Sequence, residues 1–83
     1  MTNQTLKRLV TWFRAAGDDR VGEVDVIHIP FETILAIVTP GANDPLLYDS
    51  YKLDPDQIVA FQKNLQQRLG ESGYVYYLEA EAG

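Results

Sequence analysis

The pentapeptide Leu-Asp-Pro-Asp-Gln, which begins at Leu53, constrains the fold of this chain more than any other segment. Asp54 stands in the position of a helix N-cap, Pro55 in the first helical position, and Gln57 three residues after the cap, as in a capping box. The pattern predicts a helix over about 55–69, preceded by an extended Tyr-rich segment and followed by a Tyr-rich strand. It also explains two of the clustered aspartates as helix-terminal residues rather than catalytic ones.

The remainder of the second half follows from this helix. Its apolar stripe consists of four residues at helical spacing: Ile58, Phe61, Leu65 and Leu69. Gly70 is placed to end the helix. Residues 74–79 include three Tyr and one Val, which favours a strand. We expect residues 80–83 to fray.

The first third of the chain is predicted to be a β-hairpin. Apolar residues in 5–14 recur at helical spacing, but the sequence Leu-Val-Thr-Trp-Phe within them favours a strand. Residues 21–29 alternate between apolar and polar types, and a strand of that kind needs a partner. The connection over 15–20 has turn composition. Gly22 indicates a bulge or turn in the second strand.

The middle of the chain is predicted to be a short helix, a loop and a short strand. Pro30 suits a helix entrance, and helical spacing continues to about Val38. Residues 39–45 have loop composition. Residues 46–52 are predicted to be a strand. The resulting order, β-β-α-β-α-β, predicts an α+β fold in which a single mixed sheet carries two helices packed on it.

Length and composition indicate one globular domain over residues 1–83, since 46% of the residues are hydrophobic and there is no repeat or linker. The absence of Cys excludes disulfides, a thiol nucleophile and a zinc-thiolate site. The N-terminal sequence lacks the pattern of a signal peptide, and no apolar stretch is long enough to span a bilayer. We therefore expect a soluble, cytoplasmic protein with no membrane partner.

The charge distribution points to the class of partner. Residues 1–20 contain four basic and two acidic residues, a net charge of +2, whereas residues 21–83 contain three basic and ten acidic residues, a net charge of -7. An acidic surface repels nucleic acids and attracts basic proteins. We therefore expect a basic protein partner and no nucleic-acid binding.

No residue pattern indicates catalysis, a cofactor or a metal. Four aspartates lie within 44–56, but they have neither the spacing nor the glycine of a calcium loop. His28 is the only histidine, and a lone histidine in an alternating strand is most often exposed or at a sheet edge. Ser50 and Thr33 are not in a nucleophile motif. We expect a protein that is not an enzyme.

Tyrosines beside acidic residues are typical of a surface that binds a basic protein. The competing explanation for most of them is half-buried packing at sheet edges with hydrated hydroxyls. The candidate partner-binding residues are Tyr48, Asp49, Tyr51, Tyr76 and Glu79.

Several short motifs together resemble a known family. They are Val-Gly-Glu at 21–23, the Asp-Pro and aromatic-rich segment at 44–53, a helix containing glutamine, and Tyr-Tyr-Leu-Glu at 76–79. This combination is similar to a family of small bacterial domains of unknown function. The chain departs from that family at Leu47, where Met is more often expected, and in its basic N-terminal extension. The resemblance implies an accessory or immunity-like protein with no assigned catalytic residues, so it transfers no functional residue to this chain.

The sequence leaves three interpretations of function open. The preferred one is a non-enzymatic acidic module that binds another protein, with an immunity or inhibitor protein as one form. The second is a ligand-binding or enzymatic domain whose pocket lies between the sheet and loop 39–52, with Tyr hydroxyls, Asp49 and His28 as its polar groups. The third is a structural domain that forms homo-oligomers through a sheet edge, so both a monomer and a homodimer are considered.

Overall fold

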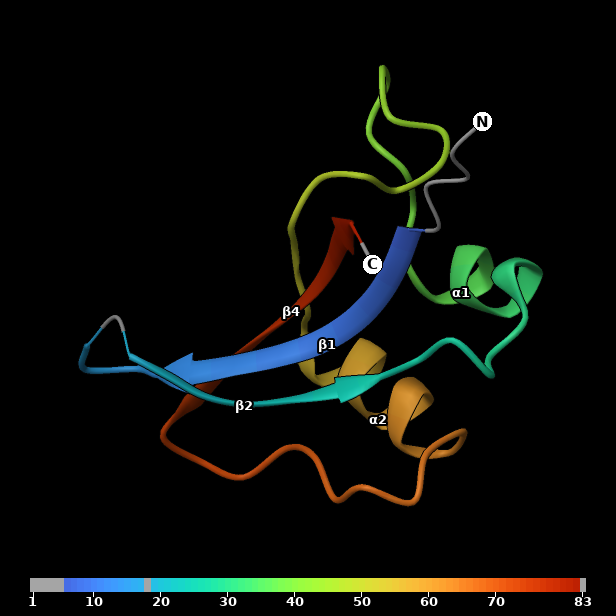
Figure 1. Ribbon diagram of the computed structural model, residues 1–83. Helices are drawn as coiled ribbons and strands as arrows, with labels where there is room; N and C mark the ends of the chain where they lie inside the picture. The colour runs from blue at the N-terminus through green and yellow to red at the C-terminus, as the bar shows by residue number, and fades with distance from the viewer. Residues whose placement is uncertain (1–5, 18, 83) are drawn as a thin grey trace.

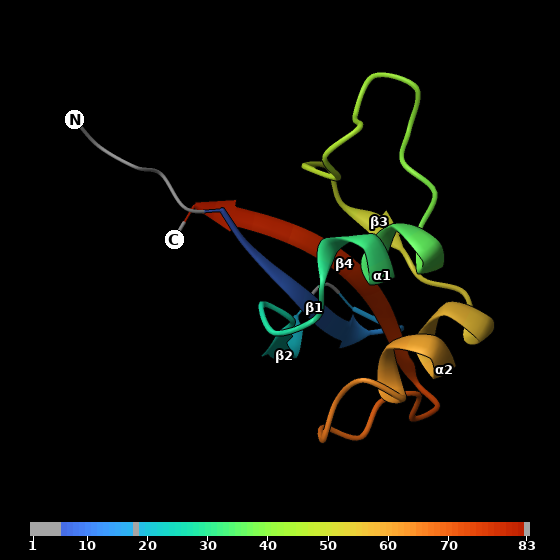
Figure 2. The ribbon, with the colours of Figure 1, turned by 90° about the vertical axis from the view of Figure 1, so that its right-hand side faces the viewer.

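The computed structural model describes residues 6–17 and 19–82 of the chain. Its elements follow in the order β1 (Leu6–Arg14), β2 (Arg20–Asp25), α1 (Phe31–Ile37), β3 (Tyr51–Lys52), α2 (Pro55–Gln62) and β4 (Tyr74–Ala82). The strands form one sheet in the order β2-β1-β4-β3, and each pairing is antiparallel (Figures 1 and 2). The predicted α+β class and element order are confirmed, with an antiparallel sheet where the pattern predicts a mixed one.

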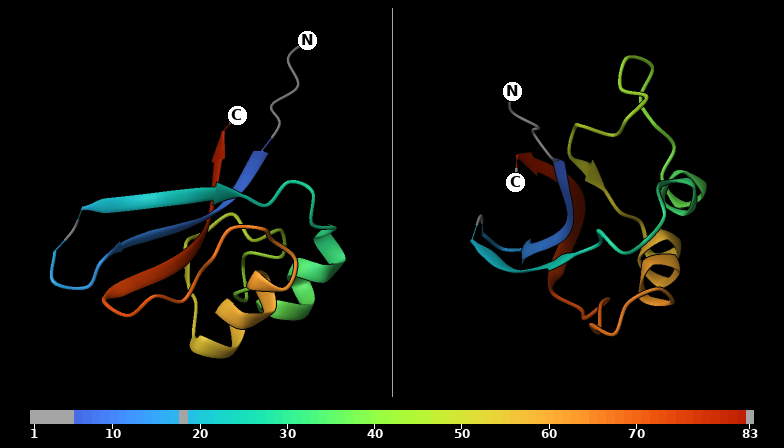
Figure 3. Two further views of the ribbon diagram at one scale, coloured as in Figure 1. Left: turned by 90° about the horizontal axis from the view of Figure 1, so that it is seen from below. Right: turned by 45° about the vertical axis from the view of Figure 1, so that its right-hand side comes forward.

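The sheet has two unlike faces, because both helices lie on the same side of it (Figures 2 and 3). No helix or strand of the described residues lies over the other side, which we call the open face. Cross-strand register and alternation assign the following residues to the open face: Lys7, Leu9, Thr11, Phe13, Arg20, Glu23, Asp25, Lys52, Val75, Tyr77, Glu79 and Glu81.

The hydrophobic core lies between the helices and the covered face of the sheet. Its buried residues come from every part of the described chain: Val10, Val26, Ile29, Ile34, Val38, Leu47, Leu53, Phe61, Leu69, Tyr76 and Leu78. The predicted short helix after Pro30 is confirmed as α1, which buries Ile34. Neither helix in the described part of the chain has the length and apolar character needed to cross a bilayer.

The longest pairing joins β1 to β4 and runs from Leu6 opposite Ala82 to Arg14 opposite Tyr74. This pairing continues β4 to Ala82, so the prediction that residues 80–82 fray is wrong. The backbone of 80–82 has hydrogen-bonding partners at the start of β1, which the local sequence does not reveal. Gly83, which ends the predicted frayed segment, lies outside the described residues.

The predicted hairpin is confirmed, and it contains a bulge beside Gly22. The register shifts between Trp12 and Phe13, because Trp12 pairs with Gly22 and Phe13 pairs with Arg20, which leaves Val21 as the extra residue. The glycine has a packing reason as well. A Cβ atom at Gly22 would lie 2.5 Å from Cζ2 of the Trp12 indole, so only glycine fits beneath this ring.

The second strand ends earlier than predicted, at Asp25 rather than near Ile29. The backbone N–H of Ile27 donates to Oδ1 of Asp25 at 2.8 Å, and this side-chain bond turns the chain out of the sheet. Thr5, the first residue of the predicted first strand, lies outside the described residues.

The predicted capping box opens α2. The backbone N–H of Gln57 donates to Oδ1 of Asp54 at 2.8 Å, and the backbone N–H of Asp54 donates to Oε1 of Gln57 at the same distance. Both bonds satisfy amides that the first helical turn leaves without a partner. The local sequence therefore predicts this helix start correctly.

The end of α2 differs from the prediction of a helix to residue 69, because α2 ends at Gln62. The side-chain amide of Asn64 donates to the carbonyl of Ala60 at 3.1 Å and so competes with the helical backbone. The side chain of Gln62 also accepts from the backbone N–H of Leu69. Leu69 is nevertheless buried, so the apolar spacing predicts burial correctly and helix length wrongly.

Candidate functional site

The segment between α1 and β3 is organised by Asp44, a carboxylate that is only 8% exposed. It accepts hydrogen bonds from the backbone N–H of Tyr48 at 2.8 Å, the backbone N–H of Asp49 at 3.0 Å and the hydroxyl of Tyr51. The Tyr51 oxygen in turn accepts from the backbone N–H of Gly41 at 2.9 Å. Asp44 therefore holds both ends of residues 41–51 together.

This network explains why the predicted strand over residues 46–52 is reduced to Tyr51–Lys52. Asp44 binds main-chain N–H groups that a strand would use for pairing. Leu47 also has a positive φ of 57°, which is incompatible with extended backbone, and its side chain is fully buried in the core. The turn predicted at Asp44 is present, and its carboxylate has a wider structural role than that prediction assigned to it.

The same contacts shift the pKa values of Asp44 and Tyr51 in opposite directions. The hydrogen bond from the Tyr51 hydroxyl, followed by those from the backbone, lowers the pKa of Asp44, because these donors stabilise the carboxylate. The bond to Asp44 raises the pKa of Tyr51, because ionising the phenol would remove the donor. Asp44 therefore stays ionised at neutral pH and serves as a structural acceptor.

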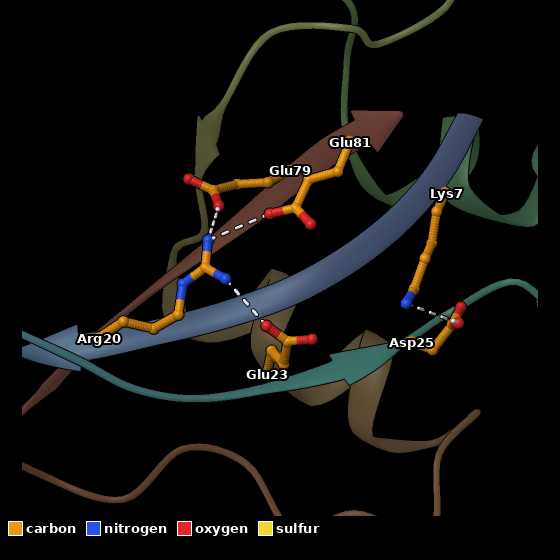
Figure 4. Close-up of polar contacts among 6 residues, drawn as sticks. All are labelled: Lys7, Arg20, Glu23, Asp25, Glu79 and Glu81. Carbon is orange, nitrogen blue, oxygen red and sulfur yellow. Dashed lines mark hydrogen bonds and ion pairs between the residues drawn. The ribbon is translucent and has the colours of Figure 1, made fainter. Parts of the chain in front are cut away.

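The open face carries a cluster of four charged side chains, which we call the Arg20 cluster: Arg20, Glu23, Glu79 and Glu81. The Arg20 guanidinium donates to Glu23 at 2.8 Å, to Glu79 at 3.0 Å and to Glu81 at 3.3 Å. Figure 4 shows these side chains reaching across β1 from β2 and β4. Three carboxylates around one guanidinium leave the cluster with a net charge of -2.

Arg20 is held as a cation by these neighbours. Partial burial works against its charge, but the hydrogen bond to Glu81 and the charges of Glu79, Glu81 and Glu23 together raise the pKa of Arg20 above its ordinary value. A separate pair, Lys7 and Asp25, lies further along the same face, with 4.0 Å between nitrogen and oxygen (Figure 4).

Aromatic side chains lie next to the cluster. The rings of Phe13 and Tyr77 meet edge to face, with centroids 5.8 Å apart and an angle of 88°. The Cζ atom of Arg20 lies 5.9 Å from the Phe13 centroid, within reach of a cation–π interaction. Thr11, opposite both Glu23 and Tyr77, is fully buried, and its hydroxyl has no hydrogen-bond partner among the described residues.

A cavity of about 390 Å³ opens on this face beside the aromatic pair. Phe13, Val75 and Tyr77 form its apolar wall, and Glu79 and Ser50 supply polar groups. The Ser50 hydroxyl donates to Oε2 of Glu79 at 3.1 Å, which connects the segment before β3 to the open face.

The five predicted partner-binding residues do not form one surface. Tyr48 is 51% exposed and Asp49 is exposed, whereas the Tyr51 hydroxyl is directed to Asp44. Tyr76 is only 3% exposed, and its oxygen accepts from a backbone N–H in the covered half of the fold, so it is not a surface residue. Glu79 alone belongs to the open face, where it is part of the Arg20 cluster.

The polar groups expected to line a pocket between the sheet and loop 39–52 do not converge on one site. His28 is exposed, as the sequence predicts, and Nε2 of His28 lies 3.2 Å from the carbonyl oxygen of Asn64. Tyr51 is bound to Asp44 instead, and Asp49 faces solvent. Within residues 6–17 and 19–82, no three His, Asp or Glu side chains are grouped so that they could hold a metal ion.

Sequence reasoning missed Arg20 and Phe13, although both are central to the open face. The guanidinium of Arg20 reaches acids 59 and 61 residues further along the chain, and local patterns carry no information on such contacts. A weak signal was present, since Glu79 and Glu81 are two residues apart on one strand and therefore share a face.

Comparison with curated proteins finds no match, and comparison with solved structures finds none either. Comparison with family models matches residues 7–79 to a family described as "Domain of unknown function (DUF7683)". The resemblance to an uncharacterised domain family is thereby confirmed at that level. Because the match spans most of the 83 residues, the chain belongs to this family of domains of unknown function.

Proposed function

We propose that this protein is a non-enzymatic module that binds a basic protein through the open face of its sheet. The Arg20 cluster is the observation that supports this proposal. This cluster already binds one guanidinium and retains a net charge of -2. Complementary charge speeds the encounter with a basic partner and makes the association sensitive to salt.

The composition of the open face suits a protein interface. It combines the half-buried rings of Phe13 and Tyr77 with an arginine and several carboxylates, and aromatic and arginine side chains are enriched where proteins bind each other. The exposed residues Tyr48 and Asp49 adjoin this face through Ser50, which is bound to Glu79. They extend the proposed surface at its β3 edge.

An inhibitor or immunity-like role in the bacterial cytoplasm is the specific form of this proposal. A protein of net charge -5 that covers a basic surface of its partner would block access to that surface. The proposal needs no catalytic group, because Asp44 is engaged by three donors and the glutamates of the open face by Arg20.

The test compares two double variants that change the net charge equally. Glu23→Gln/Glu81→Gln removes two charges from the open face, and Glu32→Gln/Asp56→Asn removes two from the first turns of α1 and α2. Immobilised wild-type protein and both variants are used for affinity capture from cells of the source organism at low ionic strength. Each captured protein is then purified and its affinity measured.

We expect the open-face variant to weaken binding of a basic partner by about tenfold and the helix-side variant to leave it within about twofold. Equal losses in both variants would show attraction to overall charge rather than to this face. Capture of no specific basic protein at low ionic strength would contradict the proposal, as would full affinity in the open-face variant.

A further inference from the structure

The cavity of about 390 Å³ on the open face is large enough for a small ligand or a side chain, since small-molecule sites begin at about 300 Å³. Its wall of Phe13, Val75 and Tyr77 is apolar and partly aromatic. Glu79 supplies a carboxylate at the cavity, and its side chain is only 22% exposed. An apolar wall with one carboxylate suits a ligand that has an apolar stem and a cationic head.

The protein's own Arg20 shows which head group this chemistry accepts. Its guanidinium lies 5.9 Å from the Phe13 ring centroid and donates to Glu79 at the same time. Arginine is favoured in such positions because its planar cation both stacks on rings and forms paired bonds with carboxylates. Arg20 does not line the cavity, so Tyr77 and Val75 remain available to a second cationic side chain.

Glu79 has acceptor capacity left for that side chain. Oε1 of Glu79 accepts from Arg20 and Oε2 accepts from Ser50, and each carboxylate oxygen can accept a further hydrogen bond. The net charge of -2 on the Arg20 cluster likewise favours a second cation over an anion.

The one basic residue at the rim does not oppose this assignment. Arg14 borders the cavity at the end of β1, opposite Tyr74, whereas Glu79 lies opposite Leu9, next to the middle of the pairing. Strand alternation also assigns Arg14 to the face of Trp12 and not to that of Phe13. Glu79 is therefore the charged side chain that the open face presents to the cavity.

We infer that this cavity is a subsite for a single arginine side chain of the basic partner, with its stem along Val75 and Tyr77 and its guanidinium at Glu79. The inference rests on the proposed function and makes it more specific. It predicts recognition of one arginine residue in addition to a general attraction between opposite charges.

The test uses N-acetyl-arginine methylamide as the probe and the neutral isostere N-acetyl-citrulline methylamide as its control. Each is titrated into the full chain labelled with nitrogen-15, and amide shifts are followed by NMR. We expect saturable shifts centred on Phe13, Tyr77 and Glu79 with millimolar affinity for the arginine probe, and none for citrulline at the same concentrations.

Variants separate the contributions of charge and ring. Glu79→Gln should weaken binding of the arginine probe about fivefold, and Tyr77→Leu about two- to fivefold. A thermal melt of each variant separates a loss of recognition from a loss of folding. Glu32→Gln on α1 should also leave binding unchanged.

Equal shifts with citrulline, shifts centred away from the cavity, or full affinity in Glu79→Gln would overturn the subsite. If the probe misses the cavity while the Glu23/Glu81 variant still loses a basic partner, the subsite is wrong and the proposed function stands. If the probe binds in the cavity but no basic protein is captured, the proposed function is wrong and the arginine site stands on its own.

Discussion

The two faces of the sheet are made by alternate residues of the same strands, yet they differ in how they are covered. On the helix-covered face, Val10, Tyr76 and Leu78 are buried among residues of the core. On the open face, Leu9 and Thr11 are just as buried, at 1% and 0% exposure, although no helix of the described residues lies over them.

This difference shows that Leu9 and Thr11 are covered by neighbouring side chains of the open face instead of by a helix. The cross-strand neighbours of Leu9 and Thr11 include Glu79 and Tyr77, and Arg20 reaches over them to the glutamates. Long charged side chains bury apolar surface with their stems while their heads stay in water. Because ion pairs hold these heads in place, less conformational freedom remains to be lost when a partner binds.

The largest expected loss of stability comes from Leu78→Ala, and its comparison is Glu79→Ala on the opposite face of the same strand. Leu78→Ala should lower the free energy of unfolding by about 2–5 kcal/mol, because Leu78 is fully buried and a cavity would remain in the core. Glu79→Ala, one residue further on, should cost less than about 1 kcal/mol, because it removes a partly exposed ion pair. Urea denaturation measures both, and similar losses would abolish the distinction between the faces.

Gly22→Ala tests the covered face where it meets the edge strand. The new methyl group would lie within 3 Å of the Trp12 indole, so either the ring or β2 must move. We expect a loss of about 1–3 kcal/mol in the free energy of unfolding, together with a shift in Trp12 fluorescence. Gly17→Ala is the matched control, since a Cβ atom at Gly17 would have no neighbour within 4 Å. Equal stability of both variants would contradict the packing of Trp12 on Gly22.

Gly22 also shows what the sequence can and cannot predict. The bulge beside it follows from a glycine inside a strand, and the capping box follows from Asp54 and Gln57, because these signals are local. The end of α2 could not be predicted, since it depends on the side chain of Gln62 binding the backbone of Leu69.

The candidate site was less predictable than the fold. Tyr76 and Tyr77 are adjacent and chemically identical, but a difference of one residue places Tyr76 in the core and Tyr77 on the open face. The sequence does not tell which phase of a Tyr-rich strand faces the helices. Glu79 was singled out for its charge, whereas its partner Arg20 comes from a strand far away in the sequence.

A substitution at Asp44 tests how residues 41–51 are held in place. This segment connects the two faces, since Leu47 enters the core and Ser50 binds Glu79 on the open face. Asp44→Asn replaces an acceptor of three donors by an amide that itself donates. We expect the melting temperature to fall by about 5–10 °C. An unchanged melting temperature would show that the segment is held by Leu47 alone.

The same residue predicts a pH dependence. Because the pKa of Asp44 is lowered in the folded protein, its contribution is complete above its ordinary value of 3.8 and is lost as the pH falls through the folded pKa. The wild type should therefore lose more stability than Asp44→Asn when the pH falls below about 4.

Tyr51, with a raised pKa, should act in the opposite direction. Its contribution is complete below 10 and is lost above it, a loss that Tyr51→Phe should not show. Thermal melts from pH 2 to 11 check both.

Thr11→Val tests whether the buried hydroxyl of Thr11 beneath the open face can be replaced by an apolar methyl group. The hydroxyl of Thr11 is buried without a partner among the described residues, and a buried hydroxyl of this kind costs about 1–3 kcal/mol. We expect Val, of similar shape, to raise the free energy of unfolding by about 1 kcal/mol. Thr11→Ser keeps the hydroxyl and loses a methyl group, so it should be destabilising. If Val destabilises the protein instead, the hydroxyl has a bound water as its partner.

Arg20→Gln should have the smallest effect on stability, below about 1 kcal/mol, because the guanidinium side chain is 37% exposed. The variant leaves three carboxylates close together without a cation, so the remaining loss is mainly repulsion between like charges. Added salt screens charges over about 10 Å at 0.1 M, and it should therefore restore most of the loss. Urea denaturation at low and high salt measures this recovery. A loss of several kcal/mol that salt does not change would mean that Arg20 acts by packing on Phe13, and the open face would then resemble the covered one.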